Sequence, residues 1–90
     1  MIDLYQAILS LGSEDECAAF MGDLCTPAEL NAMRERWLIA NLLYEGQLSY
    51  REISAQTGAS TTTIGRVARF LQQENNKGYL RIIERLTQNA

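Results

Sequence analysis

The sequence of 90 residues has no histidine, one proline and only two cysteines. A tetrahedral zinc site uses four Cys or His ligands, so Cys17 and Cys25 by themselves predict no metal site. No apolar run approaches the roughly 20 residues of a membrane span, and the N-terminus lacks the pattern of a signal peptide. A Gly-rich phosphate loop and a nucleophile motif are also missing, which argues against an enzyme. We therefore expect a non-enzymatic, cytoplasmic protein with reduced thiols and no cofactor.

Charge is distributed unevenly along the chain, although the formal net charge is only -3. Residues 1–25 contain five acidic residues and no lysine or arginine. Residues 47–90 contain six basic and three acidic residues. An anionic partner would therefore meet the second half of the chain.

Cap and stop signals divide the sequence into helices and predict no strand. The segments Thr26–Glu29 (TPAE) and Ser49–Glu52 (SYRE) are capping boxes, in which the first hydroxyl and the last carboxylate each accept a hydrogen bond from a backbone N–H group. Gly12, Gly46 and Gly58 follow predicted helices as C-terminal glycines. We predict an all-α fold with six helices, over 2–11, 14–24, 27–45, 50–57, 61–73 and 79–87.

The second half of the third predicted helix is apolar on nearly every side. Residues 37–40 and 42–44 are all hydrophobic, in a chain that is 47% hydrophobic overall. A helix that is apolar all round must be buried all round, and a single small domain has little room to do this. The pattern predicts a homodimer in which this helix crosses its partner copy.

A short helix, a turn with Gly58 and a second helix form the plan of a helix-turn-helix unit. Ile53, Ile64 and Val67 are expected to pack between the two helices, and Ser54 is small enough for close approach. The second helix begins with the hydroxyl run Ser60–Thr63. Such side chains can hydrogen-bond base edges from the N-terminus of a recognition helix in the major groove.

Two alternatives to DNA reading remain open at this point. Ser60 and Thr61 could form a plain helix cap, with the rest of the hydroxyl run as solvated surface. Some helix-turn-helix units also bind only proteins, so a protein-interaction module without DNA binding is the rival function.

The chain resembles the Trp repressor superfamily, in particular its YerC-type branch. The resemblance covers roughly Thr26 to Leu86. It depends on several motifs taken together: TPAE at 26–29, Arg36, Gly-x-x-Ser-x-Arg-Glu at 46–52, Gly58, Thr-Ile-x-Arg at 63–66 and GYLRIIERL at 78–86. It implies one Trp repressor-like domain that forms an intertwined homodimer on palindromic operators. Within it, residues 1–46 and 74–90 would serve dimerisation, and residues 47–73 would be the helix-turn-helix.

Family positions also imply site residues. Thr61, Thr62 and Thr63 match the base-facing start of the recognition helix, and Tyr50 and Arg51 match phosphate-contacting positions. The remaining expected DNA-binding residues are Ser54, Ser60 and Arg69, with Arg69 equally well explained as a solvated side chain.

In the tryptophan-dependent repressor two arginines sandwich an indole, and they match Arg36 and Arg66, with Thr26 beside the ligand. Val67 and Phe70 stand where the repressor has small pocket residues, so they would fill the indole's place. We therefore do not expect tryptophan as co-repressor. Two interpretations of Arg36 and Arg66 remain open. They could bind a different small effector, or they could have a structural role in which each caps carbonyl groups or pairs with Glu35 or Glu52.

Overall fold

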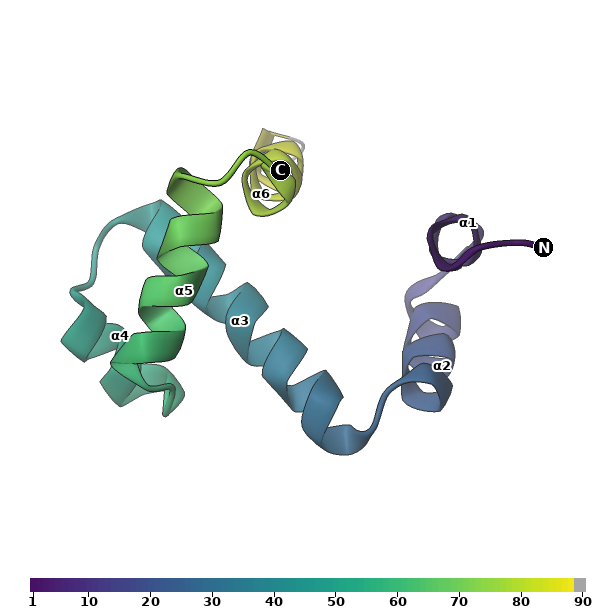
Figure 1. Ribbon diagram of the computed structural model, residues 1–90, viewed down its shortest axis with the longest axis horizontal. Helices are drawn as coiled ribbons and strands as arrows, with labels where there is room; N and C mark the ends of the chain where they lie inside the picture. The colour runs from purple at the N-terminus through teal and green to yellow at the C-terminus, as the bar shows by residue number, and fades with distance from the viewer. Residues whose placement is uncertain (89–90) are drawn as a thin grey trace. The chain divides into compact units, whose positions relative to one another are not determined.

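A computed structural model describes residues 1–88, which form six helices and no strand. The all-α prediction is confirmed (Figure 1). The helices are α1 (Leu4–Leu9), α2 (Glu14–Leu24), α3 (Pro27–Glu45), α4 (Tyr50–Thr57), α5 (Thr61–Gln72) and α6 (Gly78–Gln88). The chain forms two compact units, residues 1–32 and residues 33 onward, and the boundary falls within α3.

The first helix is shorter than the predicted range 2–11. Asp3 is its N-cap, because the Asp3 carboxylate accepts from the Gln6 N–H at 2.9 Å and the Gln6 side chain accepts from the Asp3 N–H at 3.0 Å. Ser10 is the C-cap, and its hydroxyl donates to the Ala7 carbonyl at 2.7 Å. The sequence predicted that Gly12 ends this helix. The helix instead ends at Leu9, with Ser10 as its C-cap.

The predicted starts of α2, α3 and α4 are confirmed. Ser13 accepts from the Glu16 N–H at the start of α2, at 3.1 Å. At the start of α3, Thr26 and Glu29 form both hydrogen bonds of a capping box, at 2.8 and 3.1 Å. The carboxylate of Glu29 accepts from the Thr26 backbone, and this holds the pKa of Glu29 below its ordinary value.

Helices α4 and α5 pack against each other and are joined by a tight turn (Figure 1). Gly58 ends α4 in the left-handed region with φ of 79°, where a side chain would be strained. Ser60 is the N-cap of α5, and its hydroxyl accepts from the Thr63 N–H. Helix α5 ends at Gln72 with Gln73 as C-cap, one residue before the predicted end.

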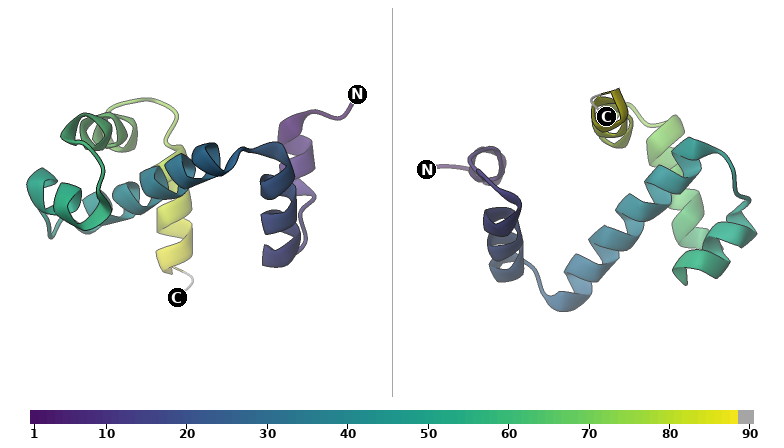
Figure 2. Two further views of the ribbon diagram at one scale, coloured as in Figure 1. Left: turned by 90° about the horizontal axis from the view of Figure 1, so that it is seen from below. Right: turned by 180° about the vertical axis from the view of Figure 1, so that it is seen from behind.

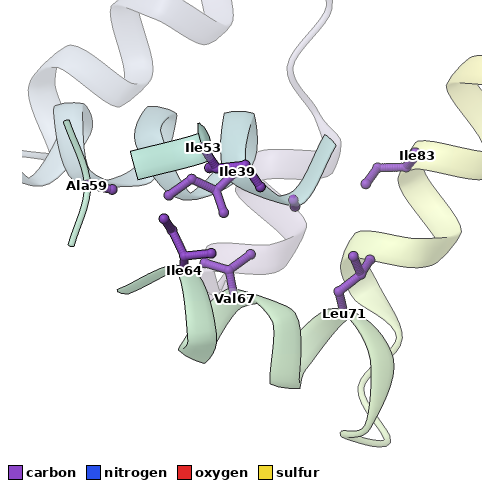
Figure 3. Close-up of a cluster of buried hydrophobic side chains, with 8 residues drawn as sticks. Ile39, Ile53, Ala59, Ile64, Val67, Leu71 and Ile83 are labelled. Carbon is purple, nitrogen blue, oxygen red and sulfur yellow. The ribbon is translucent and has the colours of Figure 1, made fainter. Parts of the chain in front are cut away.

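The core of residues 33–88 lies where α3, α4, α5 and α6 meet (Figure 3). Ile53, Ile64 and Val67 are at most 1% exposed, which confirms the predicted contact between the two helices of the helix-turn-helix. Full burial of each such side chain contributes about 1.5–3 kcal/mol. Ile39 from α3 and Ile83 from α6 join the same cluster, so the core fixes α5 on three neighbouring helices.

A loop with one unusual backbone conformation connects α5 to α6 (Figure 2). Lys77 has φ of 57°, in the left-handed region, and α6 begins at the next residue, Gly78. The observed helix therefore extends one residue beyond the predicted range 79–87 at each end.

The apolar belt of α3 is only partly covered within one chain. Ile39 and Ala40 are completely buried, but Leu38 is 48% exposed and Tyr44 is 42% exposed. The expectation that this helix is buried all round is thus not met by a single copy. Among residues 1–88, no helix has the length and hydropathy needed to cross a membrane.

Candidate nucleic-acid interface

Helix α5 has a buried face and an exposed face with different chemistry. Ile64, Val67, Ala68 and Leu71 recur at helical spacing and are all buried. The opposite face carries Thr61, Gly65 and Arg69, which are four residues apart, and Thr62, which lies three residues before Gly65. The core therefore holds α5 with this second face outward.

The four hydroxyls at the start of α5 have two distinct functions. The Ser60 hydroxyl accepts from the Thr63 N–H and donates to the Thr63 hydroxyl, both at 3.1 Å, so this pair caps the helix. Thr61 and Thr62 are exposed, and their hydroxyls form no side-chain hydrogen bond within residues 1–88. They are the two hydroxyls left available for an external partner.

The preceding helix offers a second set of exposed groups. Tyr50, 43% exposed, and Arg51, also exposed, lie in the first turn of α4. The capping box of this helix is complete, because Ser49 and Glu52 exchange hydrogen bonds of 2.9 and 3.1 Å. The N–H group of Ser49 stabilises the carboxylate and holds the pKa of Glu52 below its ordinary value.

Ser54 serves the turn in this structure. Its hydroxyl donates to the Ala59 carbonyl at 2.7 Å, in a partly buried position. This bond stabilises the segment between α4 and α5 and uses the only donor of the side chain. The structure therefore gives Ser54 a role in holding the two helices together, and its expected contact with DNA stays a prediction.

Gly65 is a candidate site residue that the sequence analysis did not select. It lies within α5, where glycine costs about 1 kcal/mol relative to alanine. A Cβ atom built at this position would meet no atom of the chain within 4 Å. Internal packing within the described residues therefore does not account for the glycine. Glycine is the residue that lets another molecule approach a helix backbone closely, which makes Gly65 a candidate. A glycine inside a predicted helix was the signal that could have identified it.

Arg69 lies farther along the exposed face and already has partners. Its Nε atom is 3.4 Å from a carboxylate oxygen of Glu74, and both side chains are about half exposed. Its guanidinium also lies 5.0 Å from the centre of the Phe70 ring. Such an exposed ion pair is weak, at about 0–1 kcal/mol, and can exchange Glu74 for a phosphate.

A pocket of about 440 Å³ opens beside the C-terminal half of α5. It is lined by Trp37, Arg66, Val67, Phe70, Asn76, Gly78, Tyr79 and Ile82. The Trp37 and Tyr79 rings are stacked with centroids 6.4 Å apart. The Arg66 guanidinium lies 4.6 Å from the centre of the Phe70 ring, a cation–π contact. The pocket is therefore mainly apolar and aromatic, with one cation at its wall.

Of the three expected effector residues, Arg66 lines this pocket. Arg36 is not among its lining residues, and the effector role of the three stays a prediction. Thr26 has the role of helix cap described above. Within residues 1–88 neither arginine forms an ion pair, so the suggested pairing with Glu35 or Glu52 is not observed. The structural role found for Arg66 is its contact with Phe70 instead.

A short helix, a tight glycine turn and a second helix with an exposed N-terminus form the arrangement of helix-turn-helix proteins. Residues 1–87 match the family described as "Trp repressor protein". The chain is 44% identical over 73 residues to the uncharacterized protein YerC of Bacillus subtilis, an alignment that covers 81% of this chain and 69% of YerC.

Two solved structures are also similar. The crystal structure of a TrpR-like protein from Eubacterium eligens has a TM-score of 0.87 and 45% identity, and the match covers 93% of this chain and 84% of that one. A structure from Staphylococcus aureus has a TM-score of 0.84 and 38% identity, with 93% and 82% covered. The chain belongs to the Trp repressor family, whose members are DNA-binding regulators and not enzymes.

Proposed function

We propose that this protein is a sequence-specific transcriptional regulator that acts in the cytoplasm as a homodimer on a palindromic operator. Helix α5 would enter the major groove, and Tyr50 and Arg51 would contact phosphates beside it. Occupation of the operator would repress transcription. Tryptophan would not be required.

One observation carries the proposal: Thr61 and Thr62 are exposed, with no side-chain partner among residues 1–88, at the N-terminus of the second helix of a helix-turn-helix. Hydroxyls at that position can donate to or accept from base edges, and each Thr methyl can contact a thymine methyl. Arg51 is exposed on the adjacent helix, where a cation would neutralise a phosphate.

The proposed dimer accounts for the apolar surface that one chain leaves uncovered. Leu38 and Tyr44 of α3 are about half exposed although they lie in the most apolar part of the sequence. A twofold axis would also place two copies of α5 on the two half-sites of a palindrome.

The test is a binding-site selection from random duplex DNA, followed by titrations of the selected duplex at several salt concentrations. We expect binding that weakens steeply as salt rises, because phosphate contacts release counterions. Arg51→Ala should weaken all duplexes alike and flatten the salt dependence. Thr61→Ala and Thr62→Ala should change base preference by about 1–3 kcal/mol at single positions.

Thr87→Ala is the matched control, because it removes a hydroxyl from α6, where the side chain donates to the Ile83 and Glu84 carbonyls. It should bind the selected duplex like the parent. Failure of the parent to bind any duplex at low salt would favour the rival function, a helix-turn-helix that recognises proteins.

A further inference from the structure

The C-terminal end of α5 holds an ion pair that a continuous helix would not allow. Arg69 and Glu74 are five residues apart, and side chains at that spacing point about 140° away from each other around a helix. Helix α5 ends at Gln72, however. The Arg69 carbonyl then accepts from the Gln73 N–H at 2.8 Å and from the Glu74 N–H at 3.1 Å. This turn of the backbone brings the Glu74 side chain beside Arg69.

Two weak contacts hold the Arg69 side chain in this place. Its Nε atom lies 3.4 Å from the Glu74 carboxylate, which is longer than the roughly 2.7–2.9 Å of a charge-assisted hydrogen bond. The Arg69 and Glu74 side chains are 53% and 44% exposed. The guanidinium also lies 5.0 Å from the centre of the Phe70 ring. An anion from outside the chain can therefore reach Arg69 and displace the carboxylate.

The pairing is selective among the cations of the chain. The sequence has eight lysine and arginine side chains, and within residues 1–88 Arg69 alone forms an ion pair with a carboxylate. This arginine is also the one that shares the exposed face of α5 with Thr61 and Gly65. An exposed ion pair contributes little to folding, so the main effect of Glu74 is on what Arg69 binds.

Arg69 lies where α5 would leave the major groove. It follows Thr61 by eight residues, which is about 12 Å along the helix. The major groove of DNA is about 8.5 Å deep. When the first turn of α5 contacts the bases, Arg69 would therefore lie at the mouth of the groove, beside the phosphates that border it. Contacts of this kind carry no base information.

We infer that Glu74 limits the affinity of the protein for DNA by competing with a phosphate for Arg69. The role of Glu74 depends on the proposed DNA binding and sets its strength. In the free protein the carboxylate holds Arg69 at the end of α5. On DNA the guanidinium exchanges the carboxylate for a phosphate oxygen, and the loss of the internal pair is subtracted from the gain. Glu74 is thus a positioning residue that acts through Arg69.

Glu74→Gln tests this role, because it keeps the size of the side chain and removes its charge. We expect affinity for the selected duplex to rise about two- to fivefold at fixed salt, the range of an exposed ion pair. Random duplex should gain equally, since phosphate contacts are independent of sequence. The slope of log affinity against log salt should steepen by up to about 0.9, the value for one more phosphate. A variant that fails to fold cannot give this gain.

Two further variants separate competition for Arg69 from a general effect of charge. In an Arg69→Ala background, Glu74→Gln should lose most of its effect on affinity, because the residue through which it acts is absent. Glu45→Gln removes an exposed carboxylate from the end of α3 that forms no ion pair within residues 1–88. It should bind duplex DNA like the parent.

The inference is overturned if more than half of the gain from Glu74→Gln remains without Arg69, or if Glu45→Gln gives an equal gain. It is also overturned if the parent binds a selected duplex and Glu74→Gln does not tighten that binding, a result that leaves the proposed function intact. If neither the parent nor any variant binds duplex DNA at low salt, the proposed function itself is refuted and the role of Glu74 is refuted with it.

Discussion

Replacing Gly65 with alanine should make the protein more stable and a weaker DNA binder at the same time. Gly65 lies in the interior of α5 with an ordinary helical backbone, since only Gly46 and Gly58 among the glycines have positive φ. A Cβ at Gly65 would meet nothing within 4 Å inside the chain. The substitution therefore adds no internal clash and removes the conformational freedom of glycine from the unfolded state.

The expected gain in stability follows from helix propensity. Alanine is favoured over glycine inside a helix by about 1 kcal/mol. For a domain of this size that gain raises the melting temperature by about 4–8 °C. The same substitution should weaken DNA binding. The new methyl group lies on the face of Thr61 and Thr62 and would hold the backbone of α5 away from the major groove. The loss of one well-fitted base contact costs about 1–3 kcal/mol, or at least about fivefold in affinity.

The assay pairs a thermal melt with a titration of the selected duplex at fixed salt. Gly22→Ala is the control, because Gly22 is also inside a helix with nothing within 4 Å of a built Cβ. It should raise the melting temperature to a similar degree and leave DNA affinity unchanged. If Gly65→Ala binds DNA as tightly as the parent while its melting temperature rises, then DNA does not approach this face of α5 and the reasoning is refuted.

Three further predictions concern tryptophan binding, the N-cap of α4 and the pH dependence of stability. Millimolar tryptophan should not shift the melting temperature, because Val67 is fully packed in the core and Phe70 is held under Arg66; a rise of roughly 10 °C would show an indole site. Ser49→Ala should lower the free energy of unfolding by about 1 kcal/mol, measured by urea titration, since it removes the N-cap of α4. The pKa of Glu52 is lower in the folded protein than its ordinary value of 4.5, so its stabilising effect is present above pH 4.5 and is lost as pH falls through the lowered pKa. The melting temperature of Glu52→Gln should therefore fall less than that of the parent between pH 5.5 and about 3, and equal losses would contradict this.

Local signals in the sequence were sufficient for most helix boundaries. The starts of α2, α3 and α4 depend on hydroxyl and carboxylate side chains within three residues of the backbone groups that they satisfy. Such contacts involve no distant residue, so the sequence contains them completely. The predicted start of α1 was wrong because Asp3 was not recognised as its N-cap, although Asp3 and Gln6 form a capping box.

Helical periodicity also identified the buried contact between α4 and α5. Ile53, Ile64 and Val67 could be assigned because a helix-turn-helix permits few ways to bring two short apolar faces together. The resemblance to Trp repressors added the expectation that the exposed face of α5 is a recognition edge, and this stays a prediction.

The roles of individual polar side chains were decided by tertiary structure. The sequence presents four equivalent hydroxyls before Ile64, but only the folded helix start separates the Ser60–Thr63 cap from the free Thr61 and Thr62. Ser54 bonds a carbonyl five residues away across a turn, which no propensity encodes.

The neighbours of Arg66 were likewise beyond local reasoning. Sequence proximity suggested carboxylates as its partners, whereas the fold places its guanidinium over Phe70 at the wall of a pocket that includes Trp37 and Tyr79. These residues come from α3, α5 and α6, and their meeting depends on how three helices pack around one core. By itself the sequence determined where helices begin and which faces are apolar, because those properties arise from short-range hydrogen bonds and spacing. Only the tertiary structure decided which polar groups remain free and which apolar faces still need a partner, because both depend on what other parts of the chain cover.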